Sequence, residues 1–305
     1  MDSNIWTEIL TDLEKRGYKG QIVSVHYLAA LQEEIESKHR QGELDEEVRK
    51  DFPPFEFRPP AALPNSESLI VVAVPQPQIQ VVFRWNGETY PLIIPPTYFS
   101  HPNKEMETIL TGLLAPSGYR VVRSLLPLKL LAVCSGLGSY GRNNICYVPG
   151  MGSFHRLMAF CSDLPCPTDH WQEAQILESC QDCNICLQSC PTSAITTERF
   201  LLHAERCLTF HNEKPVEVPF PAWVNPSWHD SLVGCMHCQM VCPQNRDFLH
   251  WIEPGTEFSE EETSILLDRT PWDQLPMVLA KKLEQFELNY IYEVFPRNLS
   301  VLLRK

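Results

Sequence analysis

The sequence predicts a mixed α and β chain, in which an α/β domain precedes a small cysteine-rich module and a short helical tail. Strand and hairpin signals alternate with helical patterns over about the first 170 residues. Cysteine spacing replaces hydrophobic periodicity from Cys180 to about Asn245, and apolar residues at helical spacing return after Val278. These shifts predict four segments, which are residues 1–60, 61–170, 171–250 and 251–305.

The amino-terminal segment carries helical patterns that stop at Gly17 and Gly42, so the first 50 residues are predicted to be helical. The second of these helices begins after Ser24, which can act as its cap. A proline-rich stretch from Phe52 to Pro64 follows, and it is predicted to be an extended linker because each proline pushes its predecessor out of the α region.

The next segment alternates strand and helix signals. Residues 69–74 form a continuous apolar run that suits a buried strand, and residues 80–85 and 89–94 flank Asn86-Gly87, a strong hairpin signal. Helices are predicted after Asn103 and over residues 127–134. Further strands are predicted over residues 119–125, 144–148 and 153–161.

Composition narrows the class of protein. The net charge of −13 argues against a broad nucleic-acid surface, which needs an excess of Lys and Arg. No run of 18 apolar residues occurs, and the first residues lack the pattern of a secretory leader, so we expect a cytoplasmic protein without a membrane span. Disulfides are disfavoured in that compartment, so the 12 cysteines predict metal ligation.

Eight cysteines fall into two motifs. The first is Cys180-x-x-Cys183-x-x-Cys186-x-x-x-Cys190-Pro191. The second is Cys235-x-x-Cys238-x-x-x-Cys242-Pro243, with Cys207 upstream in place of its first member. Bacterial ferredoxins with two [4Fe-4S] clusters use this run, and the fourth cysteine of each run ligates the other cluster. Structural zinc sites also use C-x2-C pairs, but zinc gives no reason for three close cysteines followed by Cys-Pro.

Crossed ligation therefore predicts two sets of ligands. The first set is Cys180, Cys183, Cys186 and Cys242, and the second set is Cys190, Cys207, Cys235 and Cys238. The four other cysteines are expected to be small structural side chains. They are Cys134, Cys146, Cys161 and Cys166.

The order of an α/β domain, a Gly-Leu-Gly-x-x-Gly turn and a split ferredoxin module resembles epoxyqueuosine reductase, a cobalamin-dependent relative of the reductive dehalogenases. The residues that carry the resemblance are Ser135 to Asn143, Gly152-Ser153, Asp163 to Pro167, Cys180 to Ile195, Arg206-Cys207 and Gly234 to Asn245. It implies a nitroreductase-like α/β domain, two [4Fe-4S] clusters and a cobalamin between the domain and the cluster module. The glycine turn is not a nicotinamide site, because no Asp or Glu occurs between Glu107 and Asp163.

The resemblance also implies residues near the corrin. These are Gly136, Leu137, Gly138, Ser139, Tyr140, Gly141, Arg142, Asn143, Gly152 and Ser153. His155 is a further candidate, for which a solvent-facing strand position is the alternative.

Three departures from the family pattern count against reduction of a tRNA-borne epoxide. Residues 119–127 contain no carboxylate where the family has its acid, and the Asp-Tyr-His element is absent around Thr97 to His101. The tail after the clusters is short and acidic, which disfavours an RNA backbone. A general acid is still needed to protonate a leaving oxygen, and the candidate tyrosines are Tyr98, Tyr119 and Tyr140.

Three functions remain open. The first is a corrinoid-dependent reductase of a small molecule, which receives electrons from a ferredoxin or flavodoxin. The second is an electron-transfer protein that reduces or activates a corrinoid for a partner enzyme, which acidic docking surfaces favour. The third is a tRNA epoxyqueuosine reductase with an altered proton donor. A plain ferredoxin leaves the large α/β domain unexplained.

Overall fold

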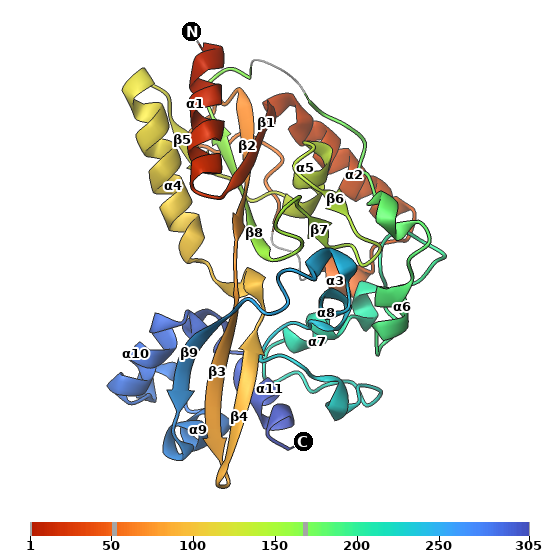
Figure 1. Cartoon of the computed structure of the whole chain (residues 1–305), viewed down its shortest axis with the longest axis vertical. Coiled ribbons are helices and arrows are strands. Elements are labelled where there is room, and N and C mark those ends of the chain that lie inside the picture. Colours follow the sequence, from red (N-terminus) through yellow and green to blue (C-terminus); the bar gives the residue numbers. More distant parts are fainter. Residues whose placement is uncertain (1, 51–53, 167–169, 305) are drawn as a thin grey trace. The chain divides into compact units, whose positions relative to one another are not determined.

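The computed structural model describes residues 2–50, 54–166 and 170–304. Contacts divide the chain into two units. Unit 1 comprises the described residues of Met1–Pro75, Ser100–Asn184 and Thr197–Leu201, and unit 2 those of Gln76–Phe99, Ile185–Thr196 and Leu202–Lys305. Figure 1 labels the elements of both. The division into four segments stays a prediction. Part of the predicted linker, Phe52 and Pro53, lies outside the described residues, as does Pro167.

Unit 1 is built on an antiparallel sheet with the order β1-β2-β8-β5. Its strands are β1 (Lys19–Ser24), β2 (Ser68–Pro75), β8 (His155–Ser162) and β5 (Val121–Arg123). The strand predicted over residues 69–74 is confirmed as β2, which is buried along both faces. The strand predicted over residues 153–161 begins two residues later, and that predicted over 144–148 is reduced to β7 (Cys146–Tyr147), which pairs with β6 (Ser139–Tyr140).

Helices cover both faces of this sheet, so alternate strand residues enter different cores. α1 (Asp2–Lys15) and α4 (His101–Leu114) pack on the face that includes Ile70, Val72 and Phe160. α2 (Leu28–Arg40) and α5 (Leu128–Cys134) pack on the opposite face. The short α3 (Glu46–Lys50) follows α2.

The prediction that the first 50 residues are helical throughout is wrong. Residues 19–24 form β1, which pairs with β2 with Ile22 opposite Ile70. Only Ile22 and Val23 of this strand are buried, so the apolar signal is too short to distinguish a strand from a helix start. Ser24 does act as a cap, but for a single 3₁₀ turn (Val25–Tyr27) that precedes α2.

Unit 2 contains a three-stranded sheet with the order β4-β3-β9. β3 (Gln78–Trp85) and β4 (Glu88–Ile94) form the predicted hairpin, with positive φ at Asn86 and Gly87. The prediction that the carboxyl-terminal tail is helical throughout is wrong, because residues Ile252–Phe258 form β9, which pairs in parallel with β3. Its sequence contains Pro254 and Gly255, which are depleted in strands, so pairing with β3 rather than local preference fixes it.

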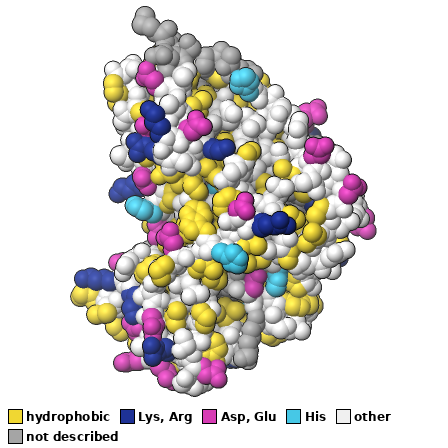
Figure 2. All heavy atoms as spheres, viewed as in Figure 1, with side chains coloured by type: hydrophobic (Ala, Val, Ile, Leu, Met, Phe, Trp, Pro, Cys, Tyr) yellow, Lys and Arg dark blue, Asp and Glu magenta, His cyan; other side chains and the backbone are white. Residues whose placement is uncertain are grey.

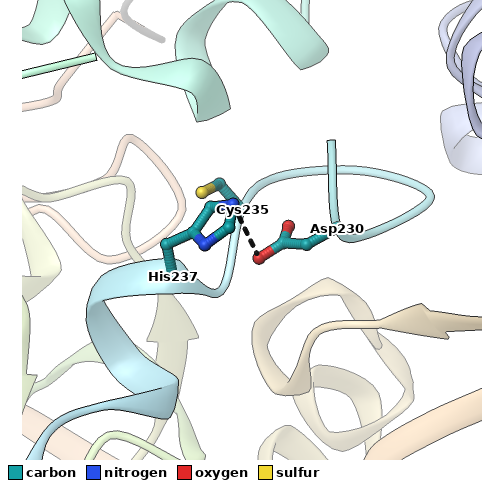
Figure 3. Close-up of side chains that lie close together, drawn as sticks. All are labelled: Asp230, Cys235 and His237. Atoms are coloured by element: carbon teal, nitrogen blue, oxygen red, sulfur yellow. Dashed lines mark ion pairs between the residues drawn. The ribbon is translucent and has the colours of Figure 1, made fainter. Parts of the chain in front are cut away.

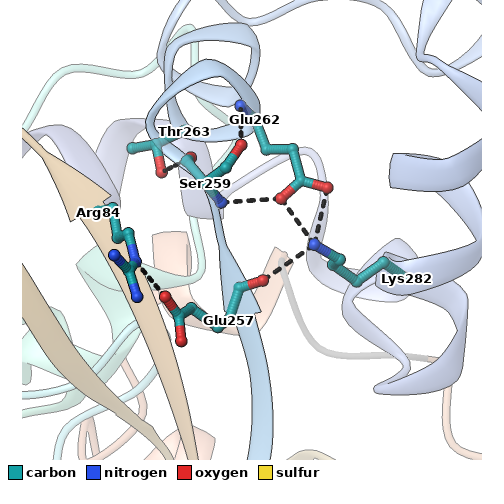
Figure 4. A network of polar contacts seen from close by, with 6 residues as sticks. All are labelled: Arg84, Glu257, Ser259, Glu262, Thr263 and Lys282. Atoms are coloured by element: carbon teal, nitrogen blue, oxygen red, sulfur yellow. Dashed lines mark hydrogen bonds and ion pairs between the residues drawn. The ribbon is translucent and has the colours of Figure 1, made fainter.

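The remainder of the tail is helical as predicted. α9 (Glu260–Leu267), α10 (Met277–Gln285) and α11 (Phe295–Leu302) pack over this sheet around Phe83 and Phe258. A capping box of Ser259 and Glu262 starts α9. Figure 4 shows Lys282, which donates to Glu262 at 2.6 and 2.7 Å and to the carbonyl of Glu257 at 2.9 Å, and thereby ties α10 to β9 and α9.

Candidate metal centre

No disulfide joins any of the 12 cysteines. The eight in the two motifs are partly buried, whereas Cys134, Cys146 and Cys161 are buried in the core of unit 1. Cys166 is partly buried against the core around α1 and α4. The four cysteines outside the motifs therefore occupy packing positions, as the sequence predicts.

The two motifs fold in the same way locally. A single-turn helix carries one cysteine of each motif, Cys186 in α6 (Ile185–Ser189) and Cys238 in α8 (His237–Met240), and these two helices pack together in unit 2. Cys207 immediately precedes α7 (Leu208–Asn212), and Cys242 precedes a 3₁₀ turn that begins at Pro243. The Cys-Pro steps thus end one short helix and redirect the chain, which the crossed ligation requires.

Unit 2 brings together the second predicted set of ligands. The sulfur of Cys207 interacts electrostatically with those of Cys190 and Cys235, and Cys235 also interacts with Cys238. Backbone N–H groups point at these sulfurs. Those of Thr209 and Phe210 donate to Cys207, that of His237 donates to Cys235, and that of Ala194 lies 3.3 Å from the sulfur of Cys190.

Without a metal the thiols of Cys207 and Cys235 are held neutral. Burial raises the pKa of Cys207, and burial together with the Asp230 carboxylate raises the pKa of Cys235 well above its usual value. Bound iron removes the proton from such a thiol, and the backbone N–H donors then stabilise the thiolate. Four converging sulfurs with N–H donors fit an iron–sulfur cluster.

The first predicted set is divided between the two units. Cys180 and Cys183 belong to unit 1, whereas Cys186 and Cys242 belong to unit 2. The shared cluster of these four cysteines stays a prediction.

Arg142 binds the backbone of the part of the first motif that lies in unit 1. Its guanidinium donates to the carbonyls of Cys180 at 2.7 Å, Cys183 at 3.0 Å and Gln181 at 3.2 Å. The planar guanidinium supplies several donors in a fixed fork, so one side chain holds three carbonyls of the loop. The resemblance implies a corrin contact for Arg142, but here it supports cysteine-bearing backbone.

Asp230 lies beside Cys235 in the same way. Its carboxylate accepts the backbone N–H of Met236 at 3.1 and 3.3 Å, and Figure 3 shows it with Cys235 and His237. These three side chains have the spacing of a separate metal site. However, Nε2 of His237 lies 2.8 Å from the carbonyl of Trp228, which can only accept, so that nitrogen carries a hydrogen and is no ligand. No sequence pattern marks Asp230.

Tyr98 lies beside the second set of cysteines. Its hydroxyl donates to Glu213, and it interacts electrostatically with Cys207 and Cys235. Burial and the neighbouring carboxylate raise the pKa of Tyr98 well above its usual value. The ring covers Gly234, which has a φ of +68° and at which a Cβ would lie 2.5 Å from the tyrosine oxygen.

The other two candidate tyrosines lie on opposite faces of the sheet in unit 1. Tyr119 packs in the core around α1 and α4, while Tyr140 packs in the core around α2 and α5, edge-on to Phe200. Tyr119 also lies next to the end of β8 away from His155, about 23 Å along that strand. The two tyrosines therefore cannot serve one substrate.

The glycine turn is packed against its own hairpin. A Cβ at Gly138 would lie 2.6 Å from the carbonyl oxygen of Tyr147, and one at Gly141 would lie 2.5 Å from the ring of Tyr147. Asn143 donates to the Tyr147 hydroxyl at 3.0 Å, and Asn144 donates to the carbonyl of Phe200 at 2.7 Å. The two glycines give room to protein atoms, so they do not fit the role of an open cradle for a corrin.

The other predicted corrin residues are enclosed to different degrees. Leu137, Tyr140 and Ser153 are buried, Ser139 is half-buried, and a Cβ at Gly136 would meet only Gln172, at 3.9 Å. Gly152 has a φ of +55°, which favours glycine there.

His155 differs from a solvent-facing strand residue, because it is 4% exposed. Its Nε2 lies 3.1 Å from the carbonyl of Cys146, so Nε2 carries the hydrogen and Nδ1 offers a lone pair. No partner of Nδ1 occurs among the described residues, and burial lowers the pKa of His155 to about 4. This atom fits a ligand of unit 1.

Comparison with known proteins agrees with this arrangement. Residues 179–245 match the family model described as a 4Fe-4S double cluster binding domain. An epoxyqueuosine reductase of Yersinia pestis is 31% identical over 149 residues, which is 48% of this chain and 34% of that protein. Over these residues the chain is similar to epoxyqueuosine reductases.

Solved structures of epoxyqueuosine reductases have the same fold. One from Bacillus subtilis has a TM-score of 0.68 at 19% identity and covers 99% of this chain and 81% of that one. Another, solved with an epoxyqueuosine-modified tRNA stem loop, has a TM-score of 0.67 at 18% identity over 99% of this chain and 80% of that one. The match to the Yersinia pestis relative spans about a third of its length.

Several structural relations escaped sequence reasoning. Arg142 and Tyr98 are singled out from the sequence, but their partners Cys180 and Glu213 are 38 and 115 residues away. No local pattern indicates such pairs.

Proposed function

We propose that the chain is an iron–sulfur oxidoreductase that passes electrons through two [4Fe-4S] clusters to a bound corrinoid and reduces a small molecule. The observation that carries the proposal is the convergence of Cys190, Cys207, Cys235 and Cys238 within unit 2, with backbone N–H groups directed at their sulfurs. The donor set fits iron–sulfur chemistry.

The corrinoid rests on the family resemblance and on the bare, buried Nδ1 of His155. A corrinoid supplies a metal centre that can be reduced to a strong nucleophile. His155 would contribute to holding it through Nδ1, and the proton donor would be a tyrosine. Tyr140 is the better candidate of the two in unit 1, since it pairs with Cys146, whose carbonyl bonds His155.

The experiment for this proposal is anaerobic purification of the full chain with added cobalamin. A stoichiometric corrinoid complex with two clusters per chain supports it. A two-cluster protein that takes up no corrinoid contradicts the corrinoid part. Turnover unchanged by Tyr-to-Phe substitution at positions 98, 119 and 140 excludes the tyrosine acid.

A second candidate function is electron transfer to a corrinoid in a partner enzyme. It is favoured by residues 119–127, which contain no carboxylate. Asp163, directly after β8, accepts hydrogen bonds from the backbone N–H and the guanidinium of Arg120 at 2.7 and 3.1 Å. Corrinoid reduction in a separate protein, without substrate turnover by this chain, would support this function.

The third candidate is a tRNA epoxyqueuosine reductase with an altered proton donor. The sequence predicts no nucleic-acid partner, yet one protein of the same fold was solved with a tRNA stem loop. On the face drawn in Figure 2, acidic and basic side chains are interspersed. Binding to an epoxyqueuosine-modified stem loop that weakens with salt would support this function.

A further inference from the structure

We infer that charged side chains of this chain order the midpoint potentials of the two clusters, with the cluster of the first set higher and that of the second set lower. The inference rests on the proposed ligand sets, and it concerns Arg142 and Asp230, which lie outside both motifs. Each is a positioning residue, because it contacts the loops that carry the cysteines.

Arg142 supplies the positive charge. Its guanidinium donates three hydrogen bonds to carbonyls of residues 180–183, which include the ligands Cys180 and Cys183. A [4Fe-4S] cluster gains one negative charge when it takes up an electron, so a fixed cation beside its ligands stabilises the reduced form. Arg142 therefore raises the midpoint potential of the first cluster.

Asp230 supplies the negative charge at the second set. Its carboxylate is held by two contacts to the N–H of Met236 and one to the hydroxyl of Ser231, and it acts on the sulfur of Cys235. A fixed anion beside the ligands destabilises the reduced cluster and lowers its midpoint potential. The imidazole of His237 is 3.7 Å away, beyond hydrogen-bond distance.

The charged neighbours in sequence of opposing sign are exposed, namely Glu178 and Asp182 at the first loop and Arg206 before Cys207. A buried cation, Arg297, donates to the carbonyl of His211, four residues after Cys207. Water and salt screen exposed charges more strongly than partly buried, hydrogen-bonded ones. Arg142 and Asp230 are partly buried and contact the cysteine-bearing loops directly, so they are screened less than these exposed charges.

The ordering gives the direction of electron flow. A reductant such as a ferredoxin, a flavodoxin or dithionite places one electron on the second cluster, which passes from the 2+ to the 1+ state. At equilibrium that electron would reside on the first cluster, which would pass from 2+ to 1+ as the second cluster returned to 2+, with no proton required.

The test is a redox titration of the anaerobic full chain, followed by EPR. Cys183→Ser and Cys238→Ser each alter one signal and so assign the two signals. In the unmodified chain the signal altered by Cys183→Ser should appear at the higher potential. The opposite order, with about eight irons bound per chain, overturns the inference but leaves the proposed function intact. Absence of two clusters would instead contradict the proposed function.

Charge variants test the cause. At a fixed potential, Arg142→Gln should lower the ratio of reduced to oxidised first cluster about tenfold. This corresponds to a fall of about 59 mV in the midpoint potential of a one-electron couple. Asp230→Asn should raise the ratio of reduced to oxidised second cluster. Arg142→Lys keeps the charge and should keep the potential. Exposed Arg123→Gln and Asp273→Asn are the matched controls, with no shift expected. Unchanged potentials in both Arg142→Gln and Asp230→Asn overturn the inference. If Arg142→Gln loses iron, the inference is tested by the order of the two midpoint potentials in the unmodified chain and by the shift in Asp230→Asn.

Discussion

The hydroxyl of Tyr98 donates a hydrogen bond to the carboxylate of Glu213 in unit 2, beside Cys207 and Cys235. The two residues are 115 positions apart, and their contact joins the 3₁₀ turn that follows the β3–β4 hairpin (Pro96–Tyr98) to the segment that follows α7. The hairpin therefore supports the loops that carry the second set of cysteines.

Loss of this hydrogen bond should weaken the fold modestly. Tyr98→Phe removes the donor and leaves the Glu213 carboxylate to water, so the free energy of unfolding should fall by about 1 kcal/mol. Anaerobic urea titration measures the change. Tyr290→Phe, at a ring that is 73% exposed, is the control and should show no change. An equal loss in both variants would contradict the contact.

Gly234 should tolerate no side chain. An alanine at this position would have to adopt a positive φ, and its Cβ would clash with the ring of Tyr98. The free energy of unfolding of Gly234→Ala should therefore fall by about 2–4 kcal/mol, and iron should be lost. The matched control is Gly112→Ala in α4, where a Cβ would meet nothing within 4 Å. The higher helix propensity of alanine should raise the free energy of unfolding by about 1 kcal/mol there. Thermal unfolding distinguishes them, and full iron in Gly234→Ala would refute the packing.

The buried amide of Asn298 should matter more than the ion pair of Lys282. Asn298 donates to the carbonyls of Asn212 at 2.9 Å and Leu232 at 3.0 Å, and Asn212 donates to that of Gly234. Asn298→Ala leaves buried carbonyls unsatisfied, which costs about 2–4 kcal/mol. Lys282→Met removes a partly exposed pair worth about 1 kcal/mol or less. Denaturant unfolding of both variants gives the comparison, and a larger loss for Lys282→Met would contradict it.

His155 should make stability depend on pH. Its folded pKa of about 4 lies below its usual 6.5, so the unfolded chain binds more protons between those values. Stability attributable to neutral His155 is complete above about pH 6.5 and is lost as pH falls toward 4, by about 3 kcal/mol in total. The free-energy difference between wild type and His155→Asn, measured from pH 5 to 7, should shrink as pH falls.

A control separates this effect from acid loss of iron. His101→Gln changes an exposed histidine and is measured beside His155→Asn over the same pH range. A constant difference for His155→Asn would exclude a neutral, buried imidazole.

Local patterns predicted much of the fold. β2 and the β3–β4 hairpin followed from an apolar run and from Asn86-Gly87, because buried strands and tight turns leave signals within a few residues. β1 and β9 were missed because each depends on pairing with a distant strand. The fold class allowed either α/β or α+β, and the antiparallel pairing of β2 with β8 favours α+β for unit 1.

In the candidate metal centre too, features with a local sequence pattern were predicted and features that depend on distant residues were not. The spacing of the cysteines predicted the second set that unit 2 brings together, because cluster geometry imposes that spacing. The glycine turn gave a misleading signal, since Gly138 and Gly141 make room for Tyr147. Sequence alone cannot distinguish a glycine that admits a ligand from one that admits a neighbouring strand.

None of the helices in the described part of the chain combines the length and the apolar character needed to cross a bilayer.

Iron and acid-labile sulfide analysis of oxygen-free full-length protein tests the eight-cysteine assignment most directly, when Cys207→Ser is measured beside the unmodified chain. The assignment predicts about eight irons and eight sulfides per chain, with about four of each left in Cys207→Ser because the second cluster is lost. Stoichiometric zinc in place of iron, or an unchanged iron content in Cys207→Ser, would contradict it.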